Sequence, residues 1–122
     1  MISASHLAGS RRNISALDEY QTPPHVTEAL MKREIFDGEI WECACGAGQM
    51  ADVLARYNHV LRTDILDGID FLQVSTPVDN IVTNPPYKLA LPFAKHGLTV
   101  AKKKVALFLR LNFLEGQIRY QF

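Results

Sequence analysis

The sequence predicts an α/β sandwich built on a mostly parallel sheet. Short apolar segments typical of strands alternate with segments of helical periodicity along most of the chain. Parallel strands need crossover connections of this kind, because their ends lie at opposite edges of the sheet. The last strand-like segment, residues 104–111, is apolar on both faces, as expected of a strand that is covered on both sides.

Composition is that of a single globular domain. The 122 residues are 48% hydrophobic and 21% charged. Thirteen basic and thirteen acidic residues cancel, so composition alone gives no electrostatic argument for a nucleic acid or an anionic membrane as partner. We interpret the two short basic clusters, Arg11–Arg12 and Lys102–Lys104, as solvated faces.

The chain shows no membrane-spanning or secretory segment, since no apolar run approaches the necessary length. Its two cysteines, Cys43 and Cys45, lack the partners of a zinc site and lie too close together for a disulfide within a strand. We therefore expect no metal, no membrane and a reducing, cytoplasmic setting.

Residues 1–18 are expected to form a loose lead-in, and residues 19–122 to form the domain. A first helix is predicted over 22–36, with Thr22 as its cap, prolines in its first turn, and Asp37-Gly38 as its stop. Further helices are predicted over 45–58 and 89–101, and the closing segment 112–122 could begin another. Strands are predicted over 39–44, 59–65, 80–83 and 104–111, with a turn and a short edge strand within 66–74.

A nucleotide pocket is indicated where the first strand ends in the letters ECACGAGQM. Gly46 and Gly48 permit a sharp turn and a close approach of a ligand to the backbone. Asp64 ends the next strand, where a carboxylate can accept both ribose hydroxyls, and Asp70 could take an adenine amino group beside an apolar wall. Each signal also has a plain structural explanation: an ordinary turn, a solvated carboxylate, or a cap.

The glycine loop differs from two common phosphate-binding patterns. No Gly-Lys-Ser/Thr follows it, and the third glycine of the dinucleotide pattern is missing. The ligand that fits this loop is therefore an adenosine without a pyrophosphate.

The combined motifs resemble those of S-adenosylmethionine-dependent amino-methyltransferases, especially adenine-specific DNA enzymes of phage or prophage type. The matching letters are ECACGAGQM, TDI, GIDFL and NPPY, preceded by DEYQTPPHVTEAL, and the similarity covers roughly residues 18–115. The resemblance implies a Rossmann-like methyltransferase sandwich. The family often has Pro and Phe where this chain has Cys43 and Ala44, so we expect different packing there.

The resemblance also assigns roles to individual residues. Glu42 would reach the methionine ammonium of S-adenosylmethionine, the glycine loop would approach the cofactor, and Asp64 would hold its ribose. Asp70 and Phe71 would lie at the adenine, while Tyr20, Thr22 and Pro23 would close the methionine side. The four histidines match no family role.

The tetrapeptide Asn84-Pro85-Pro86-Tyr87 is suited to hold an amine. An exocyclic adenine amine is a poor nucleophile, and two fixed oxygen acceptors can draw its nitrogen toward tetrahedral geometry. Asn84 offers a side-chain carbonyl and Pro85 a backbone carbonyl, while the prolines remove competing donors and fix φ. Tyr87 offers a face for a flipped base. A capped turn with a packed tyrosine is the structural alternative.

The expected reaction is methyl transfer from S-adenosylmethionine to the adenine amine in DNA. RNA adenine and protein glutamine are alternative substrates, because the same tetrapeptide occurs in families that methylate them, and an inactive cofactor-binding or interaction module is a further alternative. Related enzymes continue beyond the strand at 104–111, so we expect a chain shortened at its C-terminal edge. The apolar edge at 105–111 makes a homodimer possible.

Overall fold

The computed structural model describes residues 21–109, and these form an α/β fold on a four-stranded, all-parallel sheet. The strands are β1 (Ile40–Glu42), β2 (Val60–Arg62), β3 (Val78–Thr83) and β4 (Ala101–Leu107). They lie in the order β2-β1-β3-β4. This confirms the predicted α/β class and parallel sheet. The predicted lead-in and the segment 112–122 lie outside the described residues.

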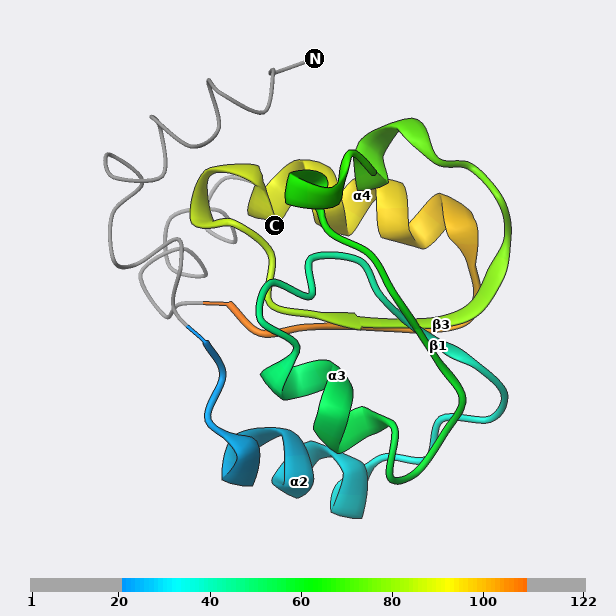
Figure 1. Cartoon of the computed structure of the whole chain (residues 1–122). Coiled ribbons are helices and arrows are strands. Elements are labelled where there is room, and N and C mark those ends of the chain that lie inside the picture. Colours follow the sequence, from blue (N-terminus) through cyan, green and yellow to red (C-terminus); the bar gives the residue numbers. More distant parts are fainter. Residues whose placement is uncertain (1–20, 110–122) are drawn as a thin grey trace, which may run out of the picture.

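Helices cover both faces of this sheet (Figure 1). The helix α4 (Ala90–Val100) lies on one face, and α2 (Pro24–Arg33) and α3 (Gln49–Leu54) lie on the other. The chain steps outward from the sheet centre in opposite directions, through α3 to β2 and through α4 to β4. Right-handed crossovers that step in opposite directions must place their helices on opposite faces, as is seen here.

Each face of the sheet packs against its own apolar core, and the side chains along a strand point alternately into one core and the other. The core under α4 contains Trp41, Cys43, Phe71, Val78, Ile81, Phe93 and Val100. The core over α2 and α3 contains Met31, Phe36, Ile40, Met50, Leu54 and Val82. Successive residues of β1 and of β3 thus point to opposite faces, so both strands are buried on both sides.

The first helix is shorter than predicted. Its N-cap is Pro23 without a side-chain cap, so the prediction of Thr22 as the cap is wrong. The helix ends at Arg33, and Glu34 is already extended, with φ −124° and ψ 134°. The chain therefore leaves the helical spacing before Ile35, which is 80% exposed, and Phe36 enters the core instead.

The segment 66–74 contains no strand, contrary to prediction. It holds two single-turn 3-10 helices, η1 (Ile65–Asp67) and η2 (Phe71–Gln73), each capped by the aspartate before it. Asx capping favours a turn over an extended ladder, which explains the difference. The last strand begins at Ala101 rather than at 104, and within residues 21–109 it forms an edge of the sheet and not an interior strand.

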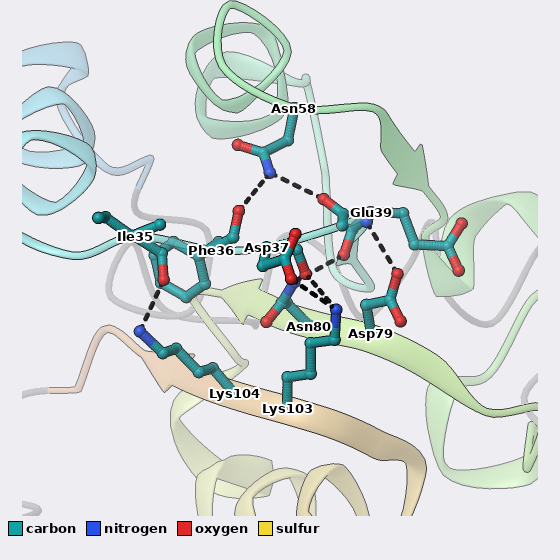
Figure 2. Close-up of polar contacts among 10 residues, drawn as sticks. Ile35, Phe36, Asp37, Glu39, Asn58, Asp79, Asn80, Lys103 and Lys104 are labelled. Carbon is teal, nitrogen blue, oxygen red and sulfur yellow. Dashed lines mark hydrogen bonds and ion pairs between the residues drawn. The ribbon is translucent and has the colours of Figure 1, made fainter.

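A polar network fixes the segment between α2 and β1 against the amino-terminal part of the sheet (Figure 2). The Asn80 side chain is fully buried and donates to the backbone carbonyls of Asp37 and Glu39, and Asn58 donates to those of Phe36 and Gly38. Outside these, Lys103 pairs with Asp37, and Lys104 pairs with Glu34 and the Ile35 carbonyl. The last two lysines of the 102–104 cluster thus have acidic partners.

Gly38 is the tightest point of this network, with φ +98°. An alanine Cβ there would lie 2.2 Å from Asp79 Oδ2, which accepts the Glu39 N–H at 3.1 Å. We expect Gly38→Ala to lower the free energy of unfolding by about 2–3 kcal/mol, from backbone strain and a displaced hydrogen bond.

The matched control for this change is Gly68→Ala. Gly68 has φ +86° with nothing within 4 Å of a new Cβ, so it carries only the backbone strain, about 1–2 kcal/mol. Urea unfolding measures both variants. Equal losses in the two would show that the Asp79 contact contributes nothing.

Candidate functional site

The candidate site lies where the order of the strands reverses. The central strand β1 pairs with β2 on one side and with β3 on the other, so the connections leave their carboxyl ends in opposite directions. Loops that diverge in this way open a crevice at the carboxyl edge of the sheet, where α/β proteins commonly bind ligands. The motif residues that follow β1, β2 and β3 all come to this edge.

Glu42, the last residue of β1, is buried with 2% exposure. Its Oε1 accepts hydrogen bonds from the Thr83 hydroxyl and, at 3.1 Å, from the Ala44 N–H. Burial raises the pKa of its carboxyl to about 7, and the nearby Asp64 charge adds to this rise. A carboxyl group whose pKa lies near neutral pH ionises readily when a cation binds beside it.

The glycine loop after β1 is held by an extension of the β1–β2 ladder. Thr63 donates its N–H to the Glu42 carbonyl and accepts the Cys45 N–H on its own carbonyl. Gly46 and Gly48 then turn the chain with φ +50° and +93° and lead into α3. At Gly48 a Cβ would approach the Arg62 guanidinium within 3.3 Å, so the missing side chain lets Arg62 cross the loop to Asp52.

Asp64 ties this loop to the next one. Its Oδ1 accepts the Gly46 N–H at 3.1 Å, and its Oδ2 accepts the Leu66 N–H at 3.0 Å. A carboxylate has four acceptor positions, so two remain for a ligand. Neither Glu42 nor Asp64 forms an ion pair within residues 21–109. Two largely buried carboxylates without a cation favour a positively charged ligand at this edge.

Asp70 and Phe71 follow in η2. The Asp70 carboxylate accepts the Leu72 N–H at 3.0 Å. Asp70 thus caps η2, which is the structural alternative that the sequence allowed for it. The Phe71 ring is 2% exposed and packs between Trp41, Phe93 and His96, with ring centroids 4.7–5.1 Å apart. Phe71 therefore fixes this loop to the apolar core. A groove of about 540 Å³ runs along this loop, lined by Gly68, Ile69, Asp70, Gln73 and Val74.

The Asn84-Pro85-Pro86-Tyr87 segment leaves β3 at the same edge. The Asn84 amide nitrogen donates to the buried Thr22 hydroxyl at 3.2 Å, across 62 residues of sequence. Pro85 is buried, and no N–H among residues 21–109 donates to its carbonyl. The Pro86 carbonyl accepts the Leu89 N–H and so begins the short helix η3 (Tyr87–Leu89).

The structure thus brings most of the predicted site residues together. Gly46 donates to Asp64, Glu42 accepts from Ala44 in the same loop, and Asn84 is bonded to Thr22. Pro23 caps α2 beside Thr22, and Tyr87 opens η3, half-buried. Tyr20 lies outside the described residues.

Three supporting residues were not predicted from the sequence. Thr83 holds the Glu42 carboxyl, the Thr63 hydroxyl accepts the Trp41 indole N–H at 2.9 Å, and the His96 ring contacts the Val74 carbonyl at 2.6 Å. The hydroxyls at the carboxyl ends of β2 and β3 were the available signal, since a buried polar side chain at a strand end needs a partner. His96 had no such signal.

Comparison with known proteins adds no evidence on the site. No protein-family model matches the chain, and no curated protein shows significant similarity to it. The fold is compatible with a Rossmann-like arrangement. In the part of the chain that the structure describes, no helix is long and apolar enough to cross a membrane. The same part holds no group of three or more His, Cys, Asp or Glu side chains placed for a metal ion.

The raised pKa of Glu42 predicts a pH dependence of stability. The folded protein holds this proton up to about pH 7, whereas the unfolded chain releases it near 4.5. Between these values the native state binds more protons, so the free energy of unfolding falls as pH rises, by about 3 kcal/mol in total. Urea unfolding at steps between pH 4.5 and 7 measures this fall.

Glu42→Gln is the control, because an amide keeps the acceptor for Thr83 and Ala44 without a titrating proton. This variant should lack the fall across the same pH range. An identical pH slope in both proteins would contradict the assignment to Glu42.

Proposed function

We propose that this chain binds S-adenosylmethionine at the carboxyl edge of its sheet and transfers the methyl group to the exocyclic amine of adenine in DNA. One observation carries the proposal: two buried carboxylates without a cation, Glu42 and Asp64, lie at the same edge as the fixed amide of Asn84. The carboxylates suit a cationic cofactor, and the amide suits an amine acceptor of the methyl group.

The residues present fit the cofactor in charge. S-adenosylmethionine carries an ammonium and a sulfonium, and its electrophilic methyl group is the chemistry that it supplies. Glu42 would take the ammonium, directly or through water, and this cation would favour the ionised carboxylate. The spare acceptor positions of Asp64 would take the ribose hydroxyls. The Gln21 amide and the Arg62 guanidinium lie beside Gly46 and Gly48, so the ligand would displace these flexible side chains to reach the loop backbone.

The adenine of the cofactor would lie at the groove along Gly68–Val74, beside the Asp70 carboxylate. The capping bond to Leu72 occupies one acceptor position of Asp70 and leaves others for an amino group. Because the Phe71 ring is in the core, the apolar wall at this groove would come from Ile69 and Val74.

Asn84 and Pro85 would position the substrate amine. Thr22 accepts from the Asn84 nitrogen, which orients the amide. The Asn84 carbonyl oxygen would act as the first acceptor for the substrate. The Pro85 carbonyl supplies the second acceptor. With both N–H groups held, the amine lone pair forms the new N–C bond while the methyl–sulfur bond breaks, its electrons passing to sulfur. The extra proton then leaves to water, so alignment and electrostatics are the main requirements.

The alternatives differ in what they do with an amine. An RNA adenine or a protein glutamine would use the same acceptors, and an inactive module would bind the cofactor without transfer. Assays with labelled cofactor on unmethylated DNA, RNA and protein substrates separate these outcomes. Transfer to DNA supports the proposal, and binding without any transfer would refute the catalytic part.

Asn84→Ala is the sharpest test of the transfer step. We expect it to leave cofactor affinity within about threefold while lowering the transfer rate by at least about 100-fold, since one of two amine acceptors is lost. Equilibrium dialysis and a methyl-transfer assay measure the two quantities.

Thr22→Val serves as the control for this change. It removes the partner of the Asn84 nitrogen but keeps the amide carbonyl, so a smaller loss of rate is expected. Retained transfer in Asn84→Ala would remove that residue from the mechanism.

A further inference from the structure

Charge is segregated along this chain although its net charge is zero. Residues 36–79 contain eight acidic residues and only two arginines. Residues 80–109 contain five lysines, one histidine and no Asp or Glu. The second segment comprises most of β3, then η3, α4 and β4, so one side of the fold carries the excess of positive charge.

Ion pairs leave only part of this positive charge available. Lys103 and Lys104 on β4 are paired with Asp37 and Glu34. Lys102 on β4 is exposed and forms no ion pair within residues 21–109, and the same holds for Lys88 in η3 and Lys95 in α4. Without an acidic residue on their own elements, these ammonium groups stay free for an anionic partner.

Of these three lysines, Lys88 and Lys95 belong to the segment that follows the Asn84-Pro85-Pro86-Tyr87 motif. Lys88 directly follows Tyr87, and Lys95 is seven residues further along, so helical geometry brings both to one side of the η3–α4 segment. Their separation along the axis is about 10 Å. This separation is large enough for the two ammonium groups to contact different phosphates of a DNA backbone.

We propose that the exposed face of η3 and α4, carrying Lys88 and Lys95, binds the phosphate backbone of duplex DNA next to the flipped base. The inference rests on the proposed function for its choice of DNA. This surface would hold the DNA substrate, which the Asn84 site cannot do alone. Phosphate contacts of this kind position a duplex without reading its sequence.

The test uses the full chain and a short fluorescein-labelled duplex, with binding followed by anisotropy over a series of salt concentrations. The double variant Lys88→Gln, Lys95→Gln should bind about tenfold more weakly at about 0.1 M salt, and the slope of log affinity against log salt should fall by about two. Lys32→Gln is the matched control, because Lys32 is an exposed lysine on α2, at the opposite face of the sheet. It should leave the slope unchanged.

Three results would overturn this inference: no DNA binding by the wild-type chain, unchanged affinity and slope in the double variant, or an equal loss in Lys32→Gln. A preference for an RNA duplex of the same length would also overturn the choice of DNA. Cofactor binding is measured on the same samples. If the double variant binds S-adenosylmethionine normally and DNA poorly, the surface is supported. If DNA binds but the cofactor does not, the proposed function fails while the surface stands.

Discussion

The parallel pairing of β1 with β3 at the sheet centre determines where every other feature lies. β2 lies beyond β1 and β4 lies beyond β3, so the chain must cross to opposite faces on its two outward steps. The connections therefore leave the carboxyl ends of the two central strands in opposite directions. The Thr83 hydroxyl bonds the Glu42 carboxyl across this carboxyl edge, and the glycine loop and Asn84 leave from its two sides. At the amino end, Asn80 joins β3 to the segment that leads into β1. The central pair is thus fixed at both ends.

Electrostatics gives this edge its chemical character. Burial makes an ionised Glu42 costly, and the hydrogen bonds from Thr83 and Ala44, together with the charge of Arg62, offset this cost only in part. Asp64, 8% exposed, adds a second negative charge close by. A bound cation would relieve both, so the binding of such a ligand and the ionisation of Glu42 should be coupled. Lys88 and Lys95 lie on η3 and α4, so the proposed anion-binding surface is separate from the two carboxylates at the sheet edge.

The sequence was informative where a local pattern decides the structure. Alternation of strands and helices predicted the parallel sheet, and the glycines predicted the loop, because positive φ at Gly46 and Gly48 depends on those residues alone. Contacts between residues far apart in the chain could not be predicted from local patterns. Thr22 was read as a helix cap but bonds Asn84, and Phe71 was placed at a ligand but packs in the core. The sequence also does not show which lysines form ion pairs, as Lys103 and Lys104 do in the structure.

The central claim is that Asp64 and the glycine loop form a cofactor site, and calorimetric titration of the protein with S-adenosylmethionine tests it most directly. Wild-type protein should bind, and Asp64→Ala should weaken binding at least about tenfold, since ribose contacts and the Gly46 bond are lost together. Asp67→Ala, which removes an exposed carboxylate from the same short helix η1, should bind like the wild type. Equal affinity in the wild type and in Asp64→Ala, or no binding by the wild type, would contradict the account.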